Sequence, residues 1–320
     1  MTTLTMRPYA GESDLLPITE LLNYCDAVDR LDDNYAVEDL RLEFADPRLD
    51  PARDLRLWED ADGQLVGFGQ IWLPPAGEQT LDAGLYWRVH PTARHGGVED
   101  EILAWGAERA REVARERGVA ARLRSGVRDG YDYGRDVLVR HGMVQVRYFF
   151  QMKRPLDQPI DEARLPEGFA LRHVAGEADV RAWVEAYNQS FVDHWGHHER
   201  TVEGHAHWLT HPSYNQERDL IAVAPDGTIA AFCFCMVDPA DNARNGRNEG
   251  WIGILGTRRG YRKIGLGRAM LLAGLHRLKA EGVDTAKLNV DADNPTGALR
   301  LYESAGFAVA QSWTTYSLDL

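Results

Sequence analysis

The 320-residue sequence predicts an α/β (α+β) fold, in which helices cover a central sheet, repeated in two copies along the chain. Short apolar runs, among them LIAVA at 220–224 and WIGIL at 251–255, have the length and composition of strands. Other stretches, such as 267–282, carry apolar residues at helical spacing. A chain that mixes both kinds of segment packs its helices against a sheet. At this length we expect two domains.

Internal similarity indicates that the two copies follow one another. Four segments of the first half reappear in the same order in the second half, at separations of 164 to 168 residues. The pairs are LTMRPYAGESDL with FALRHVAGEADV, starting at Leu4 and Phe169; DGQLVGF with DGTIAAF, starting at Asp62 and Asp226; RHGG with RKIG, starting at Arg94 and Arg262; and RHGM with SAGF, starting at Arg140 and Ser304. Four matches in one order indicate a tandem repeat.

The boundary between the copies is predicted in the segment 153–168, KRPLDQPIDEARLPEG, which has three prolines and no apolar periodicity. Proline restricts its own backbone and that of the residue before it, so the segment is typical of a linker. We therefore expect an N-terminal domain at 1–153, a linker at 154–166 and a C-terminal domain at 167–320.

Composition narrows the classes of partner. The 49 acidic and 36 basic side chains give a net charge of -13, which argues against nucleic acid as a partner and mildly favours cationic small molecules. There is no apolar run long enough for a transmembrane helix and no secretory signal at the N-terminus, so we expect no membrane partner. The three cysteines, Cys25, Cys233 and Cys235, lack metal-ligand spacing and indicate reduced thiols in a cytoplasmic protein.

One glycine-rich segment concentrates positive charge in this acidic chain: RRGYRKIGLGRAML, residues 258–271. It joins the predicted strand 250–257 to the predicted helix 267–282. The unpaired N–H groups and positive dipole end of a helix N-terminus attract anions. Gly265 and Gly267 permit close approach, and three basic side chains add charge-assisted hydrogen bonds: Arg262, Lys263 and Arg268. The pattern predicts a pyrophosphate site, although it is neither the P-loop nor the G-x-G-x-x-G motif.

The run Arg262-Lys263-Ile264-Gly265-Leu266-Gly267 resembles the pyrophosphate loop of the GCN5-related N-acetyltransferases (GNAT), Arg/Gln-x-x-Gly-x-Gly/Ala. The following segment 286–307 also resembles that family. This resemblance implies two tandem GNAT-type domains, each with a mixed, mostly antiparallel sheet flanked by helices, and acetyl-CoA as the cofactor. It also implies the cofactor contacts: Leu255, Gly256 and Thr257 along the pantetheine arm, residues Arg262 to Gly267 and Arg268 at the pyrophosphate, and Asn294 near the pantetheine.

The resemblance further implies direct acetyl transfer to a primary amine of a small molecule. That reaction needs a base for the amine and an acid for the leaving thiolate. Tyr302 is our candidate acid, with a core tyrosine as the alternative. Glu249 is our candidate base, because it shares strand parity with Trp251 and Gly253; a solvated carboxylate at a strand end is the alternative.

A histidine-rich segment, 188–208, supplies the candidate acceptor contacts. In GNAT proteins the chain after the first strand and helix borders the acceptor, which implies Asp193, Trp195 and His198 as contacts and His194 as a second candidate base. A polar surface and a metal site are the alternatives. The spacing lacks the fixed ligand pairs of a zinc site, so we expect no metal.

The N-terminal copy departs from the pattern. Its loop ends in Glu99 where the C-terminal copy has a small residue, and Leu138 stands opposite Tyr302. A carboxylate in the loop would repel pyrophosphate. We therefore expect a degenerate first domain and a catalytic second domain, and the protein to be a monomer, with a dimer as the alternative. A non-catalytic acyl-CoA-binding sensor or docking module is the competing function.

Overall fold

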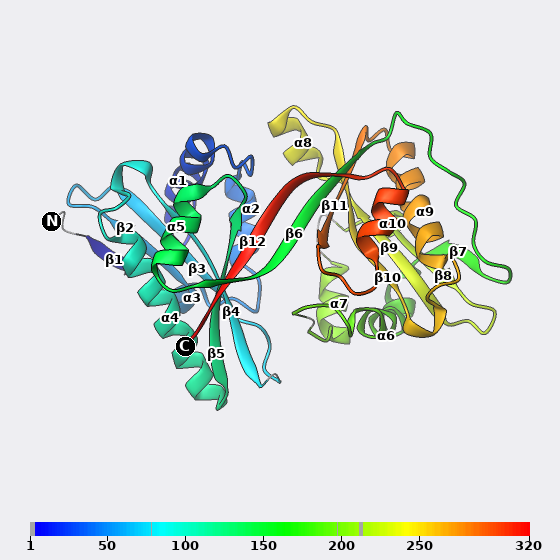
Figure 1. Ribbon diagram of the computed structural model, residues 1–320, viewed down its shortest axis with the longest axis horizontal. Helices are drawn as coiled ribbons and strands as arrows, with labels where there is room; N and C mark the ends of the chain where they lie inside the picture. Colours follow the sequence, from blue (N-terminus) through cyan, green and yellow to red (C-terminus); the bar gives the residue numbers. More distant parts are fainter. Residues whose placement is uncertain (1–3, 78, 197, 211–213) are drawn as a thin grey trace. The chain divides into compact units, whose positions relative to one another are not determined.

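The computed structural model describes residues 4–77, 79–196, 198–210 and 214–320. It divides into two compact units (Figure 1). The N-terminal unit comprises Met1–Tyr148 together with Trp313–Leu320, and the C-terminal unit comprises Phe149–Ser312. Among the described helices, none combines the length and the apolar character that crossing a membrane requires.

The N-terminal unit is a sheet in the order β1-β2-β3-β4-β5-β12, with helices on both faces. Its strands are β1 (Thr5–Pro8), β2 (Leu55–Glu59), β3 (Leu65–Trp72), β4 (Thr80–Val89), β5 (Ala120–Arg128) and the end of β12 (Ala308–Asp319). Its helices are α1 (Glu12–Asp29), α2 (Val37–Phe44), α3 (Pro51–Asp54), η1 (Pro91–Ala93), α4 (Val98–Arg117) and α5 (Asp132–Arg140). Successive residues of β2 enter different cores: Leu57 packs with α1 and α2, and Trp58 packs with α4.

The C-terminal unit repeats this plan in the order β6-β11-β10-β9-β8-β7. Its strands are the end of β6 (Val144–Pro155), β7 (Ala170–His173), β8 (Asp219–Val223), β9 (Ile229–Met236), β10 (Glu249–Thr257) and β11 (Thr285–Asp291). Its helices are η2 (Gly176–Asp179), α6 (Val180–Phe191), α7 (Val202–Trp208), η3 (Gln216–Arg218), α8 (Pro239–Asn245), η4 (Arg259–Tyr261), α9 (Leu266–Ala280) and α10 (Ala298–Ser304). In β9, Phe232 faces α6 and Cys233 faces α9.

The predicted repeat is confirmed in detail. Among the described strands, each unit has one parallel pair, β4 with β5 and β10 with β11, and its other pairs are antiparallel. The same ion pair fixes the first turn of both copies. Arg7 binds Asp14 and Arg172 binds Asp179, each with a 2.9 Å hydrogen bond. The predicted fold class, with a mixed and mostly antiparallel sheet flanked by helices, is therefore correct.

The units differ from the predicted domain ranges at their last strands. Strand β6 lies late in the first repeat, yet its residues from Phe149 onward pair with β11 of the C-terminal unit. Conversely, residues 313–319 of β12 pair with β5 of the N-terminal unit. Sequence similarity assigns each strand to its own repeat, whereas hydrogen bonding depends on which sheet edge the strand meets. Within the predicted linker, Arg154 and Pro155 still belong to β6, and the following segment has no helix or strand until β7.

Candidate active site

Strands β10 and β11 separate and leave an opening in the C-terminal sheet. They pair at three positions, Glu249 with Thr285, Gly250 with Ala286 and Trp251 with Lys287. Strand β10 then continues to Thr257 without a further pairing to β11 in the described chain. The edge of β10 that faces the opening thus keeps its backbone hydrogen-bonding groups for a ligand.

Two glycines shape β10 along this opening. Gly253 is an extra residue in the pairing with β9, where the register shifts between Ile252 and Ile254. At Gly256 a Cβ atom would lie 2.2 Å from the Phe232 ring, so glycine alone fits there. The predicted pantetheine contacts Leu255, Gly256 and Thr257 therefore follow the bulge at Gly253, on a strand segment that packs closely against Phe232.

The predicted pyrophosphate loop ends at a helix N-terminus that no side chain caps. Gly265 is the N-cap residue of α9, with φ of +87°, and no acidic residue lies in the first turn. A Cβ on Gly267 would lie 3.3 Å from the Thr257 hydroxyl, so helix and strand approach closely there. Leu266 is buried in the core, while Lys263 and Ile264 are exposed. These features suit an anion that binds backbone N–H groups.

The arginines hold this loop in place. Arg262 donates to Asp193 Oδ2 at 2.9 Å, to the Ser190 carbonyl at 2.8 Å and to the Thr257 carbonyl at 3.2 Å. Arg259 also binds Asp193, and these hydrogen bonds lower the pKa of Asp193 to about 2. Asp193, predicted as an acceptor contact, thus ties the loop to the end of α6. Arg268 pairs with Asp161 at 2.7 Å.

Tyr302 and Asn294 lie on the segment that follows β11. Tyr302 is buried on α10, edge-on to Phe307, and burial raises the pKa of its hydroxyl well above the usual value. In the described chain this hydroxyl has no hydrogen-bond partner, and its proton is retained at neutral pH. The Asn294 side-chain oxygen accepts from the Thr296 amide at 2.9 Å. Its amide nitrogen contacts no partner among the described residues.

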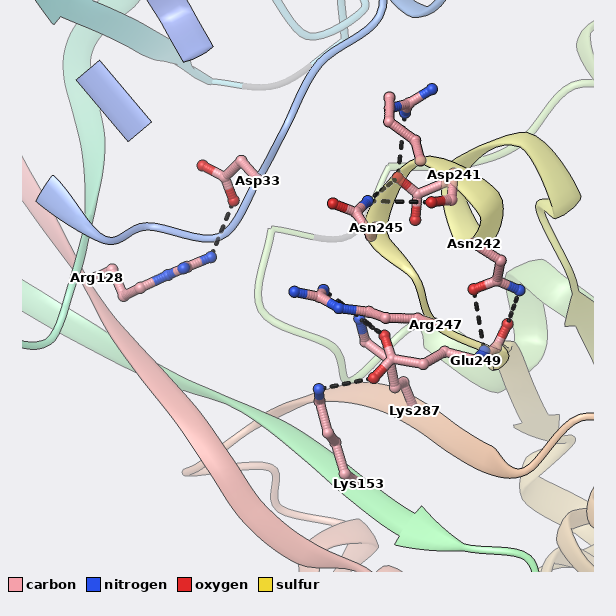
Figure 2. Close-up of polar contacts among 10 residues, drawn as sticks. Asp33, Arg128, Lys153, Asp241, Asn242, Asn245, Arg247, Glu249 and Lys287 are labelled. Atoms are coloured by element: carbon pink, nitrogen blue, oxygen red, sulfur yellow. Dashed lines mark hydrogen bonds and ion pairs between the residues drawn. The ribbon is translucent and has the colours of Figure 1, made fainter. Parts of the chain in front are cut away.

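Glu249 lies between cations at the start of β10 (Figure 2). Its carboxylate accepts from Lys153 at 2.8 Å and from Lys287 at 2.8 Å, and Arg247 lies 3.9 Å away. Burial acts to raise the pKa of Glu249, but the hydrogen bonds from both lysines outweigh it and lower the pKa. The sequence analysis did not predict the two lysines; the one local signal is that Lys287 lies between the apolar residues Ala286 and Leu288.

The other predicted acceptor contacts follow α6. His194 Nδ1 lies 2.9 Å from the Trp195 carbonyl, and the Trp195 ring lies 5.8 Å from that of Phe149. His198 is half-buried. His205, in the same histidine-rich segment, is buried instead: its ring stacks on that of Trp183 with 4.1 Å between the ring centres, and burial lowers its pKa to about 4. Within the described residues, no group of three metal-ligating side chains converges.

Comparisons with known proteins agree with this geometry. The profile of the acetyltransferase (GNAT) family matches residues 180–307. A mycothiol acetyltransferase from Thermobispora bispora is 32% identical over 82% of this chain and 81% of its own. One from Salinispora arenicola is 30% identical over 92% of this chain and 89% of its own.

Solved structures add the architecture. A GCN5-related N-acetyltransferase from Sphaerobacter thermophilus, 25% identical, superimposes with a TM-score of 0.79 over 99% of this chain and 95% of its own. A tandem GNAT protein from the clavulanic acid biosynthesis pathway, 17% identical, gives 0.73 over 99% and 98%. The chain belongs to the GNAT family, as an acetyl-CoA-dependent N-acetyltransferase built from two tandem GNAT folds.

Proposed function

We propose that the C-terminal unit alone carries out the transfer, moving the acetyl group directly from acetyl-CoA to the primary amine of a small molecule. The opening between β10 and β11 supports this proposal, because it runs from Trp251 to the uncapped N-terminus of α9. An extended strand from Trp251 to Thr257 spans roughly 20 Å, a length that suits a pantetheine arm. Bound there, acetyl-CoA supplies the activated thioester.

The cofactor contacts of the proposal are those of the loop and the strand. Backbone groups of residues 255–257 bind the arm, and the N–H groups of residues 263–267 bind the pyrophosphate. Arg262 fixes the loop, Lys263 and Arg268 add positive charge, and the Asn294 amide donates to the arm.

The acid of the proposal is Tyr302. Its retained proton can pass to the thiolate as the C–S bond breaks. Glu249 is the proposed base and His194 the second candidate. The lowered pKa of Glu249 keeps its carboxylate ionised at neutral pH, as an acceptor of the ammonium proton must be. Trp195 and His198 border the acceptor, and Asp193 borders it while holding the loop.

The N-terminal unit is proposed to bind no coenzyme. Glu99, whose side chain is 1% exposed, accepts from the His95 backbone N–H at 2.9 Å. The carboxylate thus takes a loop donor that a phosphate would need. Arg140, 3.4 Å away, supplies its counter-charge.

The relatives named mycothiol acetyltransferase support a small-molecule acceptor. We place the protein in the cytoplasm, since its cysteines are unpaired and buried. We also propose that it is a monomer, with a dimer as the alternative. The alternative is a non-catalytic acyl-CoA-binding sensor or docking module. The unpartnered Tyr302 hydroxyl favours the enzyme.

The variant Tyr302→Phe separates these two functions. It keeps the buried ring and removes the acid, so we expect kcat to fall about 100-fold while acetyl-CoA still binds. Release of the coenzyme thiol measures the rate, and calorimetric titration measures binding. As a matched control, Tyr316→Phe in the N-terminal unit should leave both unchanged. Unchanged turnover in Tyr302→Phe would remove the acid role, and absent turnover in the natural protein would favour the sensor.

A further inference from the structure

The side chains around Glu249 carry more positive than negative charge. Lys153 and Lys287 stand directly opposite each other in the pairing of β6 with β11. Each ammonium binds a different oxygen of the same carboxylate, that of Glu249, at 2.8 Å. Lys287 is 8% exposed and lies 4.5 Å from the centre of the Trp251 ring. In the described chain, neither lysine has a second carboxylate partner.

Such an arrangement is unfavourable without a further anion. Like charges directly opposite on neighbouring strands destabilise a sheet, and a buried ammonium needs a full counter-charge. Here two lysines share one carboxylate, and Arg247 adds a third cation at 3.9 Å. One carboxylate therefore serves two ammonium groups in a partly buried site (Figure 2).

The N-terminal unit provides an internal comparison. Its Asp82 occupies the place of Glu249. The last parallel pair of the N-terminal unit is Gly84 with Arg124, and Asp82 lies two residues before Gly84. The last parallel pair of the C-terminal unit is Trp251 with Lys287, and Glu249 lies two residues before Trp251. There, Arg124 and Arg122 lie 2.8 and 3.5 Å from Asp82, and Arg122 also lies 3.3 Å from Asp319. Two carboxylates balance two arginines. The excess of cations is thus particular to the C-terminal unit.

The excess lies where the transfer takes place under the proposed function. Lys287 belongs to the last pair before β10 and β11 separate. If the pyrophosphate binds at α9 and the arm follows β10, the acetyl group arrives near Trp251 and Lys287. An acceptor at this point meets two ammonium groups and one carboxylate.

We propose that the acceptor carries a carboxylate beside its amine, as an α-amino acid does, and that Lys153 and Lys287 bind this carboxylate. The inference rests on the proposed function. When the acceptor takes over the lysine hydrogen bonds, Glu249 loses the interactions that weaken it as a base. It then accepts one proton from the acceptor ammonium. The amine nitrogen bonds to the thioester carbon, the C–S bond breaks, and the thiolate takes the Tyr302 proton. The second proton of the amine nitrogen then passes to the Tyr302 oxygen, which leaves a neutral amide and a neutral tyrosine.

The test compares α-amino acids with their amides, which keep the amine and lose the charge. We expect kcat/KM for the acids to exceed that for the amides about tenfold or more. The variants Lys287→Met and Lys153→Met should remove most of this preference by lowering the value for the acids. The value for the amides should not fall, because removing a lysine also removes a hydrogen bond that weakens Glu249 as a base. Lys287→Arg should restore part of it. The control Lys279→Met, on the exposed face of α9, should keep it.

Product binding tests the same point without turnover. Calorimetry with N-acetylated amino acids and their amides, in the presence of coenzyme A, should give the same preference and the same dependence on the lysines. Equal values for acids and amides in both assays, or a preference that survives both lysine variants, overturns the inference. Turnover only of amines that lack a carboxylate would also overturn the inference, while leaving the proposed function intact. Failure of acetyl-CoA itself to bind would instead remove the proposed function.

Discussion

The two units have the same strands in the same order, yet their parallel pairs open onto different surroundings. In the C-terminal unit, backbone groups of β10 line the gap where β10 and β11 separate. In the N-terminal unit the Ser125 hydroxyl, just past the last pair of β4 and β5, donates to the Leu85 carbonyl at 2.9 Å and accepts from the Trp87 indole at 3.2 Å. Side chains thus bridge the strands where the backbones part.

The helices α4 and α9, which precede the second strand of each parallel pair, also differ between the units. α4 begins with three acidic residues, Glu99, Asp100 and Glu101, whereas α9 has none in its first turn. Strand β4 pairs with β3 without interruption, and β10 has the extra residue Gly253. Under the proposed function, one fold serves as a binding site or as a packed structural unit, depending on whether its own side chains satisfy the backbone groups where the parallel strands separate.

The largest effect is expected from moving the acidic residue into the C-terminal loop. Gly267→Glu places a carboxylate where the N-terminal unit has Glu99, next to the backbone donors of the loop. Acetyl-CoA affinity should fall about 100-fold or more, the ratio that a loss of some 3 kcal/mol produces. Calorimetric titration measures the affinity. Ala280→Glu, at the exposed end of the same helix, adds the same charge and should bind normally. Normal binding by Gly267→Glu would show that the loop is not the pyrophosphate site.

A smaller effect is expected from removing the carboxylate of the N-terminal loop. Glu99→Ala leaves the His95 N–H without its acceptor, and the free energy of unfolding should fall by about 1–3 kcal/mol. Urea titration measures it. The number of acetyl-CoA sites should stay at one, because Trp87 and Ser125 still bridge the strands. A second site would mean that Glu99 alone keeps the coenzyme out.

The smallest effect concerns the carboxylate between the lysines. The folded state lowers the pKa of Glu249, so this group stabilises the fold above its unfolded pKa, and that contribution is lost as pH falls through the folded pKa. Glu249→Gln should cost about 1 kcal/mol at pH 7, and the difference from the natural protein should narrow below about pH 4.5. Urea titrations at both pH values measure it. A difference independent of pH would contradict the ionic origin.

Much of this protein is determined by its sequence alone, because the decisive patterns are local. The repeats locate two copies, and the run 262–267 locates the proposed anion site, since a left-handed backbone such as that of Gly265 requires a residue type that can be read directly. Glu99 marks the altered copy in the same way. Secondary structure and loop conformation depend on neighbours in the chain, so each of these features could be predicted from a single segment of the sequence.

Only the tertiary structure decided which distant groups meet. Lys153 and Glu249 are 96 residues apart, and they meet because β6 pairs with the C-terminal sheet and not with its own repeat. Asp193 belongs to the loop because the end of α6 packs against Arg262, 69 residues away. Hydrogen bonding at a sheet edge is satisfied by any strand of suitable geometry, so sequence similarity could not say which strand completes which unit.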